Sequence, residues 1–226
     1  MTWRRLETGR EVYFNRDELK TRSRALPPRL RKTASGVRYL APEDPDGGGT
    51  WLAVNEKGLT LALLNRWHEQ GERLDSQRSR GGLIPSLIDC GTAAEARFSL
   101  EGMSLDCFRP FTLVLLGEED VVMAWDGASL LEEPGECPLT SSSFRFEEVR
   151  RARKEAYAGA ADDLATFHAG GGSCASAYTV RMNRPDAQTW SRSVIRLGQD
   201  IFWTYYEEMP DLEGAPVEHR ARLDLA

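Results

Sequence analysis

The chain has 226 residues, of which 41% are hydrophobic and 28% are charged, which is ordinary globular composition and excludes wholesale disorder. The net charge of −6 argues against a dedicated nucleic-acid binder. The mean hydropathy is −0.47, and no apolar run approaches the ~20 residues of a membrane helix, so no membrane span is expected. Neither a secretory signal nor a linker is visible. We therefore expect one cytoplasmic domain over residues 1–226.

The cysteines and histidines are scattered. They are Cys90, Cys107, Cys137, Cys174, His68, His168 and His219. A zinc site needs cysteines or histidines a few residues apart, so the sequence predicts no metal site. Without a secretory signal, the cysteines are expected to be free thiols.

A hairpin is predicted at the start of the chain. Residues 2–6 and 11–14 have the composition of strands, and Gly9 lies in the turn between them. The next stretch, residues 16–38, is polar and basic, and its two adjacent prolines at 27–28 disfavour regular structure. We therefore predict an irregular basic segment after the hairpin.

A second hairpin is predicted from residues 51–54 and 59–64. These two apolar runs flank Asn55-Glu56-Lys57-Gly58, where Gly58 supplies the positive φ of the turn. Two short helices follow. In the first, Pro85 lies in the first turn, and Leu83, Leu87 and Ile88 share one helical face. Residues 92–100 form the other helix, capped by Thr92.

The second half of the chain combines a third hairpin with helices and closing strands. Residues 111–116 and 121–125 form the hairpin, and residues 144–158 form a charged helix. That helix is expected to turn Val149, Ala152 and Ala156 inward.

A short helix over residues 162–168 precedes three predicted strands. These strands cover residues 178–182, 189–196 and 201–205. Hairpins therefore come first, helices lie in the middle and strands return at the end. This order predicts the α+β class with antiparallel sheets rather than a series of βαβ units.

The cluster Asn15-Arg16-Asp17-Glu18 is the most informative local feature. Four polar residues are expected to end a buried strand, because unpaired buried charge is costly. Strand ends present side chains into clefts, so a functional site is one interpretation of the cluster. A solvated turn is the other, and the local pattern leaves both open.

Five stretches together carry a family resemblance. They are Asn15–Glu18, Gly48–Ala53, Asn55–Gly58 leading to Asn65, Ser79–Gly81 and Arg181–Ala187. In this order along nearly the whole chain, they resemble the NRDE family, also called the transport and Golgi organisation protein 2 family. That family is similar to N-terminal nucleophile hydrolases such as bile salt hydrolases and penicillin V acylases. The resemblance implies a four-layer αββα sandwich of antiparallel sheets.

The resemblance also implies roles for individual residues. In these hydrolases a cysteine after the initiator methionine attacks an amide, and its own α-amino group is the base. Arg16 and Asp17 resemble the pair that steadies this nucleophile. Asn65 resembles a donor to the oxyanion, and Ser141 stands where a second such donor, an asparagine, is expected.

The start of the chain departs from the family pattern. No cysteine follows Met1, and the pair Thr2-Trp3 comes about three residues earlier than in the family. We therefore hypothesise that the start codon is assigned too far downstream. Thr2 is a candidate nucleophile itself. However, side chains alternate faces along a strand, so an offset of three would turn Thr2 to the wrong side of the sheet.

Further residues are candidates for binding a substrate. Thr50 and Trp51 follow three glycines that could let the backbone approach a ligand, although Trp51 is equally interpreted as core. Arg80 is suited to grip a carboxylate, or else is a solvated residue before a helix. Asn15 of the polar cluster and His168 complete the predicted binding set.

Two functions are compatible with these features. The first is an amidase or acyltransferase acting on small carbon–nitrogen amides, which requires an upstream cysteine. The second is a non-catalytic binding or trafficking protein for haem or an acyl lipid, with His168 and His68 as candidate haem ligands. Either function predicts a small-molecule ligand, while no cofactor is required by the sequence and the oligomeric state is left open.

Overall fold

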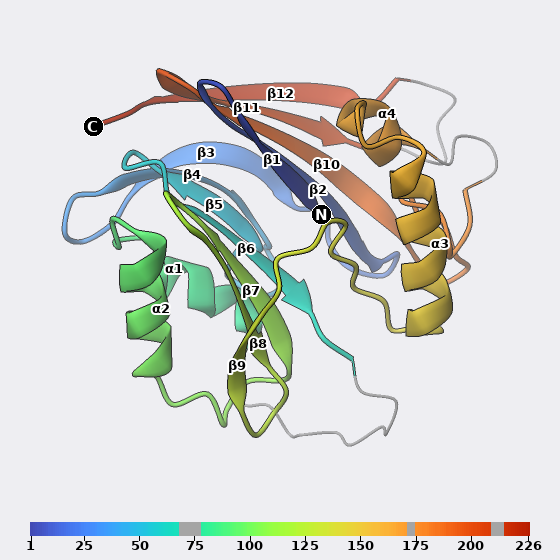
Figure 1. The fold of residues 1–226 in the computed structure, drawn as a ribbon, viewed down its shortest axis with the longest axis horizontal. Coiled ribbons are helices and arrows are strands. Elements are labelled where there is room, and N and C mark those ends of the chain that lie inside the picture. The colour runs from blue at the N-terminus through green and yellow to red at the C-terminus, as the bar shows by residue number, and fades with distance from the viewer. Residues whose placement is uncertain (68–77, 171–174, 209–214) are drawn as a thin grey trace. The chain divides into compact units, whose positions relative to one another are not determined.

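The computed structural model describes residues 1–67, 78–170, 175–208 and 215–226 and contains two β-sheets (Figure 1). The chain divides into two compact units, residues 1–27 with 136–222 and residues 28–135 with 223–226. Strand pairs in both sheets are antiparallel, which confirms the predicted α+β class with antiparallel sheets. Within the described ranges, no helix is long and apolar enough to cross a membrane.

The first unit holds a five-stranded sheet. In spatial order its strands are β1 (Thr2–Leu6), β2 (Gly9–Leu19), β10 (Ala187–Leu197), β11 (Asp200–Glu207) and β12 (Val217–Asp224). Two helices belong to this unit, α3 (Phe146–Ala158) and α4 (Leu164–Ala169). Leu164 of α4 packs on Tyr13 and Val194 of the sheet, so one face of the sheet is buried under α4 (Figure 1).

Strand β2 is longer than predicted. It continues through Asn15–Glu18 because these residues pair with β10, up to Leu19 opposite Ala187. Pairing satisfies the backbone groups on that side, and the polar side chains then alternate between the two faces. The prediction that the polar cluster ends the strand is therefore wrong. The stabilising partner strand lies more than 150 residues away in sequence, where local patterning does not reveal it.

The second unit holds a seven-stranded sheet. In spatial order its strands are β3 (Leu26–Lys32), β4 (Arg38–Glu43), β5 (Leu52–Asn55), β6 (Thr60–Asn65), β7 (Phe111–Leu116), β8 (Asp120–Trp125) and β9 (Leu130–Glu133). The second and third predicted hairpins are confirmed as β5–β6 and β7–β8. Gly58 has a φ of +81° in the β5–β6 turn, as predicted.

Two helices cover one face of this sheet. They are α1 (Leu83–Leu87), which follows the short 3₁₀ turn η1 (Arg80–Gly82), and α2 (Ala93–Glu101). The helices bury Leu83, Leu87 and Leu100 against apolar residues of β6, β7 and β8 (Figure 1). The Thr92 hydroxyl accepts a hydrogen bond from the backbone N–H of Glu95 at 3.1 Å, which confirms the predicted cap.

The prediction of an irregular segment over residues 16–38 is wrong. Strand β3 contains Pro27 and Pro28 and lies at the edge of the seven-stranded sheet. An edge strand tolerates proline because one row of its backbone groups has no neighbouring strand to bond. Proline therefore marks the edge of the sheet here rather than a break in regular structure.

Two further predictions need correction. Residues 178–182 form bends and irregular backbone rather than a strand, and an isolated bridge joins Asn183 to Gln188 just beyond them. On α3, Val149 is buried as predicted, but Ala156 is exposed and the charged residue Arg153 is buried. The reason is a carboxylate partner for Arg153 on β2, described below.

Candidate functional site

Thr2, Asn15 and His168 form a buried hydrogen-bond chain in the first unit. The Thr2 Oγ1 atom lies 2.8 Å from His168 Nε2, and His168 Nδ1 lies 2.8 Å from Asn15 Oδ1. The Asn15 Nδ2 group donates to the carbonyl oxygens of His168 and Val180, at 3.0 Å each, so its Oδ1 is the acceptor. His168 therefore carries its proton on Nδ1, and the Thr2 hydroxyl donates to Nε2.

This chain has the order of a nucleophile, a base and an orienting group, but it is inaccessible. Thr2 and His168 are both 0% exposed, so neither side chain meets solvent or a dissolved substrate. Burial, reinforced by the nearby N-terminal amino group, holds the pKa of His168 well below its usual value. The arrangement thus fastens α4 to β1 and β2 through a neutral imidazole.

The burial of His168 argues against its predicted role as a binding residue. Both ring nitrogens are hydrogen-bonded within the first unit, and the ring stacks on Tyr13 with centroids 5.4 Å apart. A haem ligand needs an accessible nitrogen, and His168 offers none in this structure. His68, the other candidate haem ligand, lies outside the described residues.

Asp17 lies two residues beyond Asn15 on β2 and so faces the same side of the sheet. Its Oδ1 accepts a 2.5 Å hydrogen bond from Thr189 Oγ1, and its Oδ2 lies 3.3 Å from Arg153 Nη2. Arg153 on α3 is only 8% exposed, so this ion pair joins α3 to the sheet. Arg153 was not among the site residues predicted from the sequence. Its spacing of four residues after the buried Val149 was the available signal, because such residues share one helical face.

Arg16 points to the opposite face of the sheet from Asn15 and Asp17, because side chains alternate along β2. It is 6% exposed, and its Nη2 lies 3.5 Å from Glu18 Oε2. The structure therefore does not bring Arg16 and Asp17 together as one pair. Thr2, opposite Tyr13, is on the face of Asn15 and His168, away from Arg16.

Residues 137–139 lie beside the start of β1, on the edge of the strand that does not pair with β2. Met1 and Leu139 exchange two backbone hydrogen bonds, of 2.8 and 2.9 Å, which is the pattern of an antiparallel pair. Two residues away, the Trp3 N–H donates to Cys137 Sγ at 3.4 Å. Burial and the nearby Arg153 lower the pKa of the N-terminal amino group to about 5, so this group is neutral at pH 7. Sequence patterning did not single out Cys137.

The glycine-rich stretch before Thr50 serves a close backbone contact in the second unit. A Cβ added to Gly49 would lie 2.4 Å from the carbonyl carbon and oxygen of Gly81. The Thr50 N–H donates to the Gly81 carbonyl oxygen at 3.1 Å, and the Thr50 hydroxyl donates to the Leu52 carbonyl oxygen at 3.0 Å. Gly49 is thus required for one backbone segment to approach another. The predicted ligand-binding role of Thr50 stays a prediction.

Replacing Gly49 with alanine should lower the free energy of unfolding by about 2–3 kcal/mol, because a methyl group would collide with backbone atoms that cannot rotate away. The matched control is Gly82→Ala, where a Cβ would meet nothing within 4 Å. Urea unfolding followed by circular dichroism measures both variants. Equal stability of the two variants would contradict the close-contact interpretation.

The other predicted residues of the second unit are held by its own backbone or lie at its surface. Arg80 Nη1 donates to the Pro110 carbonyl oxygen at 2.8 Å. Trp51 is 9% exposed, which favours its interpretation as core. Asn65 ends β6 with an exposed side chain. Ligand contacts for these three residues, and the oxyanion role of Asn65, stay predictions.

The motif Asn55-Glu56-Lys57-Gly58 has a clear structural role. Asn55 is 0% exposed, and its Oδ1 accepts hydrogen bonds from the backbone N–H groups of Lys57 and Leu59, at 3.1 and 3.0 Å. Its Nδ2 donates to the carbonyl oxygens of Ile88 and Cys90, at 2.8 Å each. One amide therefore closes the β5–β6 turn and fastens it to the end of α1.

The fold is similar to that of a known amide hydrolase. The N-acylethanolamine-hydrolyzing acid amidase ortholog of Caenorhabditis elegans superposes with a TM-score of 0.55 at 13% sequence identity, over 83% of this chain and 87% of that one. The chain thus has an N-terminal nucleophile hydrolase-like fold. Residues 12–129 match the sequence model of Transport and Golgi organisation 2, and the chain belongs to that family. Both resemblances predicted from the motifs are confirmed. A search of curated proteins finds no match.

Proposed function

We propose that this protein is an amidase or acyltransferase acting on a small carbon–nitrogen amide, with a nucleophilic cysteine three residues upstream of Thr2. The register of β1 and β2 supports this position. Thr2 is opposite Tyr13, and each step back along β1 is one step forward along β2. If the pairing continues, a residue three before Thr2 would lie opposite Arg16.

The pairing on the other edge of β1, with residues 137–139, supports the same position for the cysteine. Met1 pairs antiparallel with Leu139. A residue two before Met1, which is three before Thr2, would therefore lie opposite the residue two after Leu139, which is Ser141. Two residues singled out from sequence alone, Arg16 and Ser141, would then flank a single position. This coincidence of two independent registers is the observation that carries the proposal.

Side-chain direction agrees with the register. A residue three before Thr2 would face the side opposite to Thr2, and Arg16 faces that side too. A guanidinium group favours the thiolate form of a neighbouring cysteine. The Ser141 hydroxyl would be suited to donate to an oxyanion, because a hydroxyl rotates to suit its acceptor.

The chemistry would then follow the N-terminal nucleophile scheme. The cysteine thiol gives its proton to its own α-amino group, and the sulfur attacks the amide carbonyl carbon. The carbon–nitrogen bond breaks, the amine leaves with that proton, and a thioester remains on the cysteine. Water hydrolyses the thioester in an amidase, whereas a second amine accepts the acyl group in an acyltransferase.

The experiment begins with the codons upstream of Met1. An in-frame Met-Cys pair that puts the cysteine three residues before Thr2 is expected. The extended protein is then treated with a cysteine-reactive acyl probe, and peptide mass spectrometry is expected to find the label on the processed N-terminal cysteine. Replacing that cysteine with alanine should abolish labelling. An absent cysteine codon, or labelling that persists in the alanine variant, would overturn the proposal.

Arg16 provides a second, graded test in the extended protein. Arg16→Met should slow labelling by about 100-fold, the usual order for losing one preorganised charged group beside a reacting atom. Arg24→Met is the matched control, because Arg24 is half exposed and pairs with Glu207. Equal labelling rates for these two variants would count against the role of Arg16.

A further inference from the structure

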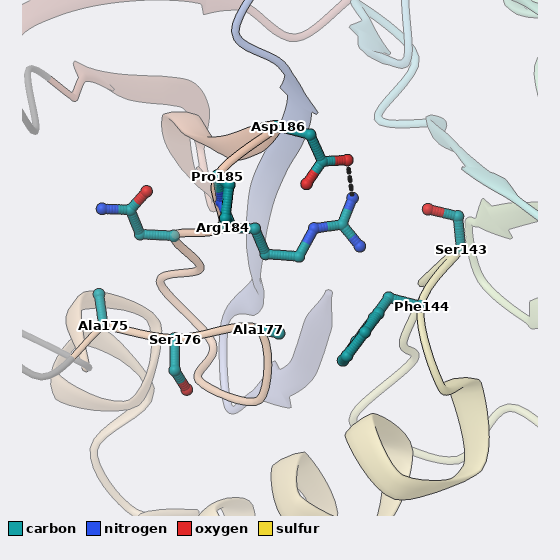
Figure 2. A pocket seen from close by; sticks show the side chains of 9 residues that line it. Ser143, Phe144, Ala175, Ser176, Ala177, Arg184, Pro185 and Asp186 are labelled. Atoms are coloured by element: carbon teal, nitrogen blue, oxygen red, sulfur yellow. Dashed lines mark hydrogen bonds and ion pairs between the residues drawn. The ribbon is translucent and has the colours of Figure 1, made fainter.

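A hollow in the first unit is lined by residues other than Met1, Thr2 and Arg16 of the β1 end. It has a volume of about 440 Å³, within the range of sites for small organic ligands. Its lining consists of Ser143, Phe144, Ala175, Ser176, Ala177, Asn183, Arg184, Pro185 and Asp186. Figure 2 shows the Arg184 guanidinium between Asp186 on one side and Phe144 on the other. Part of the family-like stretch Arg181–Ala187 thus forms one wall.

Arg184 is largely buried but incompletely hydrogen-bonded within the described residues. Its side chain is 13% exposed, and its Nη2 lies 3.0 Å from Asp186 Oδ2. Its Nε atom is buried and has no hydrogen-bond partner in that part of the chain. A buried donor without a partner is costly, and the Nε–Nη edge of a guanidinium matches the two oxygens of a carboxylate.

Asp186 is poorly suited to hold that edge permanently. Its side chain is 59% exposed, so its carboxylate can return to water at little cost when another anion approaches. A ligand carboxylate at the Nε edge would supply the missing acceptor. Asp186 then acts as a competitor that a ligand must displace.

Phe144 supplies an apolar wall opposite this charge. It is 37% exposed, its ring centroid lies 5.8 Å from the Arg184 guanidinium carbon, and the Arg145 guanidinium carbon lies 5.5 Å from the same ring. Arg145 has a φ of +39°, the one positive φ at a non-glycine residue among those described. Such strained backbone is concentrated at functional sites, and here it lies between the lining residue Phe144 and the start of α3.

We propose that this hollow binds a small organic anion in which a carboxylate is attached to a flat apolar body. The carboxylate pairs with the Nε edge of Arg184, and the flat body lies against Phe144. Asn183 and Ser143 add polar side chains to the lining. This site is independent of the proposed acyl-transfer chemistry, since it uses none of the residues at the β1 end.

The test uses 2-naphthoate as the probe and 2-naphthamide as its neutral counterpart, with binding measured by isothermal titration calorimetry. Naphthoate should bind about tenfold more tightly than naphthamide, because only the acid forms charge-assisted hydrogen bonds. Arg184→Gln should remove that preference. Arg220→Gln is the matched control, because the Arg220 side chain is 80% exposed and pairs with Glu218.

The variant Asp186→Asn distinguishes a specific effect on the binding site from an effect of misfolding. Removing the competing carboxylate should tighten naphthoate binding about threefold, a gain that a misfolded variant would not show. Equal binding of the acid and the amide, no binding of either, or weaker naphthoate binding by Asp186→Asn would each overturn the proposal. Retention of the acid preference in Arg184→Gln would do the same.

Discussion

Replacing Asn55 with alanine is expected to lower the free energy of unfolding by about 4 kcal/mol, because two backbone donors and two backbone acceptors, buried or partly buried, lose their partner at once. Two of these groups belong to the β5–β6 turn and two to the end of α1. The loss is therefore expected to loosen both elements together. Urea unfolding followed by circular dichroism measures the change.

Two variants of the same turn sharpen this test. Lys57→Ala removes one hydrogen bond, from Nζ to the Asp89 carbonyl oxygen, at an exposed site, and should cost about 0.5 kcal/mol. Asn55→Asp keeps the acceptor but directs a carboxylate at the two carbonyl oxygens, so it should be at least as damaging as alanine. If Asn55→Ala were no worse than Lys57→Ala, the bridging role of Asn55 would be excluded.

For the 226-residue chain that begins at Met1, and not for the extended chain proposed above, acidification from pH 8 to pH 5 is expected to destabilise the first unit strongly. The N-terminal amino group has a pKa of 8.0 when solvated and about 5 in the fold. Over this interval the unfolded chain binds a proton that the folded chain does not bind, so the free energy of unfolding falls as the pH falls, by about 3 kcal/mol in total. Below pH 6.5, His168 adds a further slope of about 1 kcal/mol per pH unit, since its folded pKa is also lowered.

The histidine contribution is isolated by comparing slopes. His168→Gln should flatten the dependence between pH 6.5 and 5.5 by about 1 kcal/mol per pH unit. Thr2→Val should be less stable than the parent at every pH but keep the full slope, because His168 stays buried. The measurement is urea unfolding at closely spaced pH values. A His168→Gln protein with the parent slope would show that His168 is not buried in neutral form.

The elements that were predicted correctly from the sequence are those that short-range interactions determine. Gly58 fixes its turn through a positive φ, and Thr92 begins α2 by capping the Glu95 N–H. The same is true of the apolar runs of β5 to β8, whose neighbours in sequence are also their neighbours in the sheet. In these cases the deciding interactions lie within a few residues.

Two of the errors share a different cause, which is a partner distant in sequence. Asn15–Glu18 remain in β2 because β10 pairs with them, and Arg153 is buried because Asp17 meets it. The chain from Thr2 to His168 likewise joins residues 166 positions apart. Sequence patterning therefore identified Arg16, Asp17 and Asn15 as informative. The face of the sheet that each side chain occupies became clear only when the structure showed that β2 continues through all three residues.

The division of the polar cluster between two faces of β2 has a consequence for classifying related sequences. Asn15 and Asp17 hold the helices of the first unit, whereas Arg16 faces away from them. If Arg16 has the proposed catalytic role, selection on architecture and selection on chemistry act on different positions of the motif. Homologues that retain the asparagine and aspartate but have lost the arginine would then be folded and inactive.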